Sequence, residues 1–297
     1  MLIRSCTKAS DCSNRTSFSL QRLTGFISVH MNMTASALET INYETRDRQV
    51  AWRGISLNEC EEFDTFMAGD VSSRLQDEEG TNDFKTTLRS LATTGFAQNS
   101  LNEILAAESI EERDWAVGEA IAEAYLTRRH NVSWPWNMER DKRTPKASLP
   151  GADLVGFEID GDDIRLALGE VKTSGEAAAP PGVMNGRGGM KHQIDDLATD
   201  LRLVAQLLRW LLPRCKGGEH QSYFKLAVSR FLNSGNKAVA LFGVLIRDTK
   251  PNQLDLEARG HALSGTVSTP ATCQLVALYL PLTIADLPKR VLGGKSP

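Results

Sequence analysis

Apolar residues in the second half of the chain follow first a helical and then a strand spacing. Residues 110–127 carry an apolar face with helical periodicity and predict the first clear helix. A short apolar run at 154–157 and an alternating run at 164–172 flank Asp160-Gly161, a dipeptide typical of tight turns. These features predict a β-hairpin that follows the helix.

The pattern changes again after the hairpin. A Gly/Pro-rich loop at 180–189 leads into an apolar stripe from Ile194 to Leu211, which predicts one long amphipathic helix that ends at Pro213. Continuous apolar runs at 238–246 and 274–282 predict two buried strands. Residues 222–232 fit a helix or a strand. The order of helix, hairpin, helix and strands indicates an α/β fold.

The first part of the chain has weaker periodicity. Residues 35–110 have polar joints between weakly periodic segments and are expected to be mostly helical. Residues 1–34 are rich in Ser and Thr and carry no pattern, so we expect disorder or a mis-assigned start there. Met31 and Met33 are alternative starts. The predicted domains are therefore a helical region over 35–109 and a main domain over 110–297.

Composition excludes several classes of protein. With 41% hydrophobic and 24% charged residues in 297, the chain is neither a disordered nor a collagen-like sequence. Its five scattered cysteines form no C-x-x-C pair, which argues against a zinc ribbon and fits a reducing cytoplasm. No apolar run approaches the ~18 residues of a membrane span. We expect a cytoplasmic protein.

Charge is segregated along the chain, although the net charge is only -3. Residues 54–124 hold sixteen acids and four Lys/Arg, whereas residues 127–146 hold six Lys/Arg and two acids. This change of sign indicates two surfaces with different partners. Solvated helix faces explain the acidic stretch equally well.

The hairpin carries the most informative polar residues. Ile164, Leu166 and Leu168 share one strand face, and the same alternation places Glu170 and Lys172 on that face. Charges at the end of a buried face cost desolvation energy unless they have partners. If the two-residue loop is Asp160-Gly161, Asp153 lies diagonal to Glu170. If the loop spans 160–163, Asp153 lies directly opposite Glu170.

Two convergent carboxylates suit a hard divalent cation. Mg²⁺ prefers oxygen ligands and keeps several waters, so Asp153 and Glu170 suffice; Mn²⁺ is an alternative. Such a cation lowers the pKa of bound water and stabilises charge on a phosphate. Lys172 would orient the water or neutralise the developing negative charge.

These residues resemble a known family. Pro150-Gly-Ala-Asp153, followed after sixteen residues by Glu170-Val-Lys172, is similar to the motif of the PD-(D/E)XK nuclease superfamily. One departure is that Ala152, not proline, precedes the aspartate. The resemblance implies an α/β, restriction-endonuclease-like core with a central mixed sheet flanked by helices. It also implies Mg²⁺-dependent hydrolysis of DNA.

The resemblance implies two supporting residues. An acid on the first core helix often joins the metal site in this family, and Gly118-Glu119 with Glu123 matches that pattern, Glu119 being preferred. A glutamine on the second helix is matched by Gln193, which would position the attacking water. Solvated surface residues are the alternative reading for each.

A basic strip before Asp153 is expected to contact the DNA backbone. Its members are Arg140, Lys142, Arg143 and Lys146, and the glycine-rich loop adds Arg187 and Lys191. Trp134 and Trp136 could stack on bases, but a buried Trp-Pro-Trp segment is the favoured interpretation.

The arrangement of a helical region before a nuclease domain is also similar to HamA-like nuclease subunits of Hachiman antiphage defence. That resemblance implies a helicase or ATPase partner docked on residues 35–109. The superfamily resemblance further implies a homodimer. A restriction-type endonuclease and a catalytically silent binding module of the same fold are the alternatives.

Overall fold

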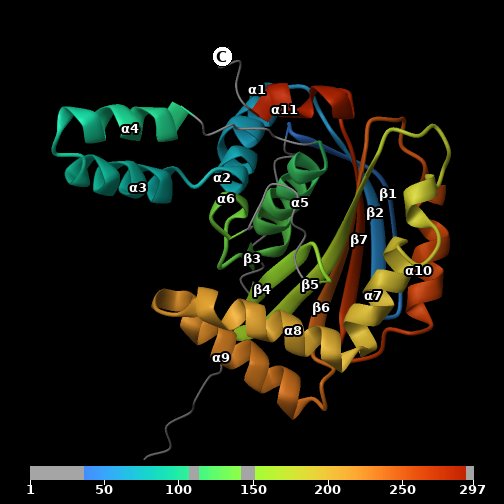
Figure 1. The fold of residues 1–297 in the computed structure, drawn as a ribbon. Helices are drawn as coiled ribbons and strands as arrows, with labels where there is room; N and C mark the ends of the chain where they lie inside the picture. The colour runs from blue at the N-terminus through green and yellow to red at the C-terminus, as the bar shows by residue number, and fades with distance from the viewer. Residues whose placement is uncertain (1–36, 107–113, 142–150, 292–297) are drawn as a thin grey trace, which may run out of the picture. The chain divides into compact units, whose positions relative to one another are not determined.

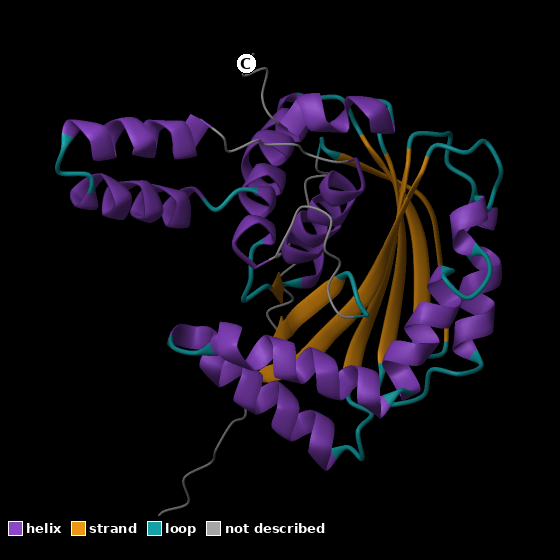
Figure 2. Cartoon of the chain, in the orientation of Figure 1, coloured by secondary structure: helices purple, strands orange, loops and turns teal. Residues whose placement is uncertain are grey.

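The computed structural model describes residues 37–106, 114–141 and 151–291. They form an α/β protein with a seven-stranded mixed sheet flanked by helices (Figures 1 and 2). The strand order is β1-β2-β7-β6-β5-β4-β3. The strands are β1 (Glu39–Asp47), β2 (Val50–Leu57), β3 (Val132–Ser133), β4 (Leu154–Asp160), β5 (Asp163–Ser174), β6 (Val239–Arg247) and β7 (Thr272–Tyr279).

The centre of the sheet is parallel and its edges are antiparallel. β2, β7, β6 and β5 run parallel, β1 and β4 run in the opposite direction, and the short β3, antiparallel to β4, runs in the same direction as the centre. Every residue of β6 is buried, as expected for a central parallel strand covered on both faces. The hairpin and the two buried strands predicted near 238–246 and 274–282 are confirmed.

Helices pack on both faces of the sheet. The first face holds α1 (Glu61–Thr65), the π-helical η1 (Phe66–Val71), α2 (Ser72–Leu75), α5 (Asp114–His130) and α11 (Leu287–Val291). The second holds α7 (Met190–Thr199), α9 (Gly218–Asn233) and α10 (Glu257–Ser264), with α8 (Leu201–Leu211) between α7 and α9. The remaining elements are α3 (Glu78–Leu91), α4 (Gly95–Ala106), α6 (Met138–Asp141), η2 (Gly182–Met184), η3 (Leu212–Cys215), η4 (Gln253–Asp255) and η5 (Ile284–Asp286).

Two glycines show which helix covers which face. Gly118 of α5 lies so close to β5 that a Cβ there would overlap the Thr173 hydroxyl. Gly243 of β6 faces α7, since a Cβ there would lie 2.7 Å from Met190 Sδ. Gly243 pairs with Glu170, and Thr173 is three positions further along β5. Because side chains alternate along a strand, α5 and α7 cover opposite faces.

The mostly helical prediction for residues 35–110 is wrong for residues 39–57, which form β1 and β2. β1 is an edge strand with mostly exposed side chains, so its sequence shows no buried face. β2 pairs with β7 and therefore belongs to the same sheet as the rest. Helices do account for most of residues 61–106. Residues 1–34 lie outside the described residues.

The long helix predicted up to Leu211 is divided at Asp200 into α7 and α8. The Asp200 carboxylate accepts hydrogen bonds from the backbone N–H groups of Arg202 and Leu203 and so caps a new helix. The apolar stripe continues across the break, which is why periodicity alone does not reveal it. Residues 222–232, which fitted either element, are helical.

No helix in the described part of the chain is both long and apolar enough to span a bilayer.

Candidate active site

The register of β4 and β5 sets the position of Asp153. Leu154 pairs with Gly169 and Asp160 pairs with Asp163, so the turn is Gly161-Asp162, one residue later than the Asp160-Gly161 alternative. Gly161 has a φ of +58°, which the tight turn requires and glycine adopts readily. Extended by one residue beyond Leu154, this register places Asp153 opposite Glu170, and the Asp153 backbone N–H donates to the Gly169 carbonyl at 3.1 Å.

Asp153, Glu170 and Lys172 come together at the end of the buried strand face. The Val171 backbone N–H donates to Asp153 Oδ2 at 2.9 Å, and Lys172 Nζ donates to Glu170 Oε2 at 3.1 Å. Glu170 is 2% exposed, while Asp153 and Lys172 are partly exposed. We call these three residues the carboxylate–lysine trio. The structure thus confirms that the three predicted positions are neighbours.

Helix α7 places Gln193 on the side of the trio. Ile194 faces the sheet, because a Cβ on Gly243 would lie 2.8 Å from its Cδ1. The next residue, Asp195, accepts a hydrogen bond from Thr266, which follows α10 in the chain. Because α10 packs on β2, Asp195 points toward the β2 side of the sheet. Gln193 precedes Ile194 and so points to the opposite flank, toward β5. Its Oε1 is buried and has no hydrogen-bond partner among the described residues.

The environment of Glu170 disfavours its ionised form. Burial, followed by the neighbouring Asp153 carboxylate, raises the pKa of Glu170 to about 8, although Lys172 acts in the opposite direction. Two carboxylates that repel each other in a poorly hydrated place are stabilised by a bound cation. The electrostatics of the pair therefore fit a divalent ion.

The donor set fits Mg²⁺ through two carboxylates. Asp153 and Glu170 supply hard oxygen ligands, and Mg²⁺ completes its shell with water. Among the residues that the structure describes, no three Asp, Glu, His or Cys side chains form a group that could hold a metal. Glu119 is therefore in no such group among the described residues, and its role as a third ligand stays a prediction.

The two acids of α5 lie on a helix that covers the opposite face from α7. Glu119 is buried, next to the close contact between Gly118 and Thr173. Glu123 is fully buried and pairs with Arg74 at 2.6 Å. That ion pair joins α2 to α5 and gives Glu123 a structural role.

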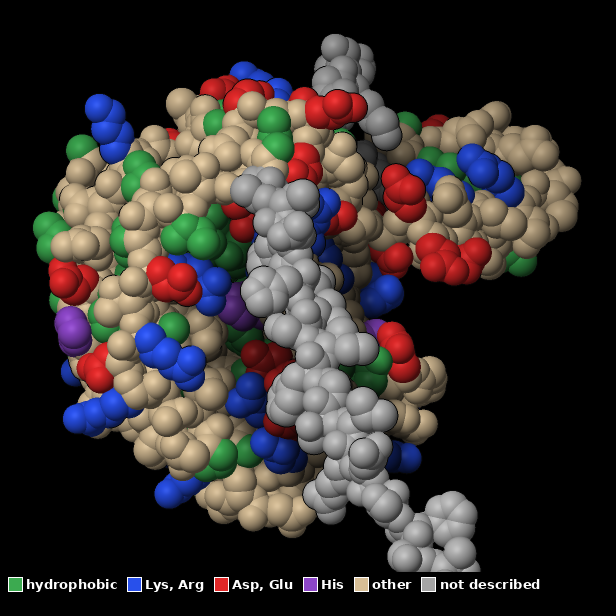
Figure 3. Space-filling view, turned by 180° about the vertical axis from the view of Figure 1, so that it is seen from behind, with side chains coloured by type: hydrophobic (Ala, Val, Ile, Leu, Met, Phe, Trp, Pro, Cys, Tyr) green, Lys and Arg blue, Asp and Glu red, His purple; other side chains and the backbone are tan. Residues whose placement is uncertain are grey.

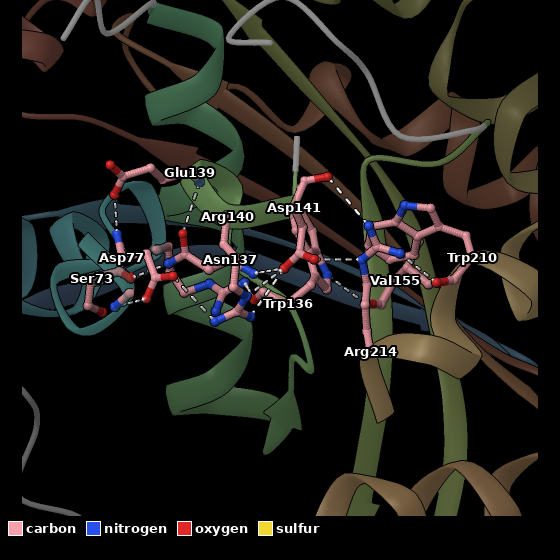
Figure 4. Close-up of polar contacts among 12 residues, drawn as sticks. Ser73, Asp77, Trp136, Asn137, Glu139, Arg140, Asp141, Val155, Trp210 and Arg214 are labelled. Atoms are coloured by element: carbon pink, nitrogen blue, oxygen red, sulfur yellow. Dashed lines mark hydrogen bonds and ion pairs between the residues drawn. The ribbon is translucent and has the colours of Figure 1, made fainter. Parts of the chain in front are cut away.

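The predicted basic strip is described at one position only. Lys142, Arg143 and Lys146 lie outside the described residues. Figure 4 shows Arg140 between Asp77 and Asp141, at 3.7 and 3.1 Å. Because two acids already neutralise Arg140, the structure does not support it as a phosphate contact.

The same network ties α6 to its neighbours. Asp141 forms an ion pair with Arg214, with 2.9 Å between Oδ1 and Nε, and this pair joins α6 to η3 (Figure 4). Asn137 donates to the Ser73 carbonyl at 2.8 Å and so joins α6 to α2. α6 is therefore a structural joint between the two groups of helices.

The other predicted contact residues have mixed outcomes. Arg187 is exposed in the loop before α7, as expected. Lys191 forms an ion pair with Asp195 and is only partly exposed. Trp134 and Trp136 are buried, and the Trp136 indole donates to the Val155 carbonyl at 2.9 Å. The favoured interpretation of Trp-Pro-Trp as a buried segment is confirmed.

Sequence reasoning missed one basic segment. Residues 201–237 hold seven Lys/Arg and a single acid, a stronger bias than in the predicted strip. The apolar stripe of α8 drew attention to its buried face only. A charge count over the same window would have found the segment.

We expect the metal-free protein to lose stability as pH rises from about 5 to 8 because of Glu170. The carboxyl ionises near 4.5 when unfolded and near 8 when folded, so the folded state holds the proton between these values. Stability then falls with rising pH by at most about 1.4 kcal/mol per pH unit. Glu170→Gln should flatten this decrease in thermal unfolding scans recorded with EDTA.

The control is Glu78→Gln, which removes an exposed carboxylate on α3. It should keep the slope of the unmodified protein. Equal slopes in Glu170→Gln and the unmodified protein would contradict the assigned burial of Glu170.

Comparisons with known proteins provide no family for the chain. No protein-family model matches the sequence, and no curated protein is significantly similar to it.

Proposed function

We propose that this protein is a metal-dependent nuclease that hydrolyses DNA phosphodiester bonds, with a PD-(D/E)XK, restriction-endonuclease-like core. One observation carries the proposal: Asp153 faces Glu170, with Lys172 beside it, where an otherwise apolar strand face ends. The placement is costly without a ligand, since Glu170 is buried next to a second carboxylate.

Asp153 and Glu170 would hold Mg²⁺, or Mn²⁺ in its place. A bound Mg²⁺ would supply charge stabilisation on the phosphate and a lowered pKa for bound water. Lys172 contributes a positive charge 3.1 Å from Glu170, where it can orient a water and offset charge that grows on phosphate oxygens. The buried Gln193 Oε1 is an acceptor for a proton of that water.

Removal of the metal tests the proposal. Purified protein should nick supercoiled plasmid DNA in the presence of Mg²⁺, and EDTA should abolish the nicking because the carboxylates alone provide no electrophile. Excess Mg²⁺ should restore it. The readout is the ratio of supercoiled to relaxed plasmid on a gel. Cleavage that persists in EDTA would exclude the assigned site.

We further propose that the chain is the effector subunit of a bacterial antiphage system and acts with a helicase or ATPase. The α3–α4 hairpin supports this partner proposal. No residue of α3 is buried, and Phe84 and Leu91 are exposed; Phe96 and Ile104 are exposed on α4. Short helices gain most of their stability from packing, so such a hairpin calls for a protein partner.

The genes beside the coding sequence distinguish this proposal from its alternative. A helicase or ATPase gene supports the defence subunit, and a methyltransferase gene supports a restriction-type endonuclease.

A further inference from the structure

Helices α8 and α9 carry a strongly basic outer surface. Their segment, residues 201–237, includes one acid, Glu219, and seven bases: Arg202, Arg209, Arg214, Lys216, Lys225, Arg230 and Lys237. Arg214 and Arg230 are engaged with Asp141 and Asp163, and Arg202 lies 3.7 Å from the Asp200 carboxylate while its side chain stays open to solvent.

Four of these bases define what we call the α8–α9 basic face: Arg202, Arg209, Lys216 and Lys225. All four are exposed, and the Arg202 side chain is 93% exposed. Uncharged hydrogen-bonding side chains lie exposed among them, namely Gln206, Gln221, Ser222 and Ser229. Lys, Arg, Gln and Ser are the side chains that contact phosphate in protein–DNA complexes.

The basic face borders the trio. Leu203 of α8 packs against Gly151, two residues before Asp153. α9 packs on the hairpin, with the Tyr223 ring 6.3 Å from the Phe157 ring. In the view from behind, Lys and Arg side chains are prominent toward the lower end of the molecule (Figure 3).

We propose that the α8–α9 basic face binds the phosphate backbone of double-stranded DNA beside the scissile bond, an inference that rests on the proposed nuclease function. It assigns a duplex-contacting surface to α8 and α9, in addition to the segment before Asp153 that the sequence predicted. The contacts are to phosphates and not to bases, so the face gives affinity without sequence preference.

The side chains of the face favour a duplex over a single strand. Proteins that bind single strands stack bases on aromatic side chains. The exposed large apolar residues described in this segment are all leucines, and Trp210, Tyr223 and Phe224 are partly buried against the core. An anionic membrane fits the α8–α9 basic face less well than DNA does. Polar side chains separate the exposed leucines, and the face adjoins two carboxylates that would repel an anionic lipid surface.

Salt-dependent binding tests the proposal. Anisotropy of a labelled DNA duplex, measured in EDTA over about 50–200 mM salt, gives the slope of log K against log salt. Arg209→Gln with Lys225→Gln removes two phosphate contacts and should reduce that slope by about 1.8. Affinity at the lowest salt should fall at least about tenfold.

The matched control is Lys85→Gln with Lys289→Gln, which makes the same charge change on α3 and α11. It should leave slope and affinity as in the unmodified protein. The proposal is overturned if the α8–α9 variant keeps its slope, or if the control loses as much affinity. It is also overturned if the unmodified protein binds a single strand, or phosphatidylserine vesicles, more tightly than the duplex and the α8–α9 variant loses that binding.

The binding assay contains no metal, so its outcome is separate from catalysis. If the unmodified protein cleaves no DNA but the α8–α9 variant loses duplex binding, the binding surface is supported and the nuclease function is rejected. If the unmodified protein cleaves DNA but the variant binds the duplex normally, the nuclease function is supported and the binding surface is rejected.

Discussion

Replacement of Lys172 by alanine should lower the single-turnover rate of DNA cleavage by about a thousandfold. The ammonium lies 3.1 Å from Glu170, and removal of one such charge or donor from a catalytic site costs about 10²–10³ in rate. Mg²⁺ binding should survive, because both carboxylates remain. Calorimetric titration alongside the cleavage assay measures the two properties separately.

Glu170→Gln is the complementary variant and should lose both Mg²⁺ binding and cleavage. Lys250→Ala, which removes an exposed lysine beyond β6, is the control and should be fully active. Cleavage by Lys172→Ala at the unmodified rate would show that the trio is not the catalytic site.

Gly169→Ala should destabilise the protein by about 3 kcal/mol, or about 10 °C in Tm. A Cβ at residue 169 would overlap the Phe242 carbonyl oxygen and lie 3.0 Å from the Phe242 Cβ. The overlap involves backbone atoms of Phe242, which cannot change rotamer as a side chain can. To relieve it, β5 and β6 must move apart beside Glu170. Cleavage should therefore fall together with stability. Thermal unfolding followed by circular dichroism measures the effect.

Gly188→Ala is the matched control for that variant. No atom lies within 4 Å of the Cβ that it would add, and the position does not have the left-handed backbone that favours glycine. It should unfold within about a degree of the unmodified protein. An equally stable Gly169→Ala would mean that β5 and β6 are less closely apposed than described.

The sequence was sufficient to predict the hairpin and the trio for a definite physical reason. Apolar alternation from Ile164 to Leu168 identifies a buried face, and Glu170 and Lys172 interrupt it. Both registers that place Asp153 on this face were deducible from a tight turn near Asp160. The choice between them depends on which residues form the loop, and the local sequence does not distinguish Asp160-Gly161 from the observed Gly161-Asp162.

Other parts of the fold and of the candidate site depend on contacts between residues far apart in the chain, which the local sequence pattern does not reveal. β1 is stabilised by pairing with β2, so its exposed polar side chains give no strand signal. The position of Glu119 depends on which sheet face α5 covers, and that follows from a glycine contact between distant residues, Gly118 and Thr173. Arg140 is basic in sequence, yet Asp77, a residue far away in the chain, neutralises it.

The hydrogen bond from Val171 to Asp153 has a consequence for how Asp153 binds a ligand. β4 begins at Leu154, so Glu170 and the residues after it lack a neighbouring strand on that side. Asp153 Oδ2 occupies the first free backbone N–H, at 2.9 Å. The carboxylate is thereby preset in orientation, and its other oxygen, Oδ1, would be the one available to the proposed cation. Asp153→Ala would also leave the Val171 amide without its acceptor, whereas Asp153→Asn keeps an oxygen for it and is the cleaner test of the proposed metal site.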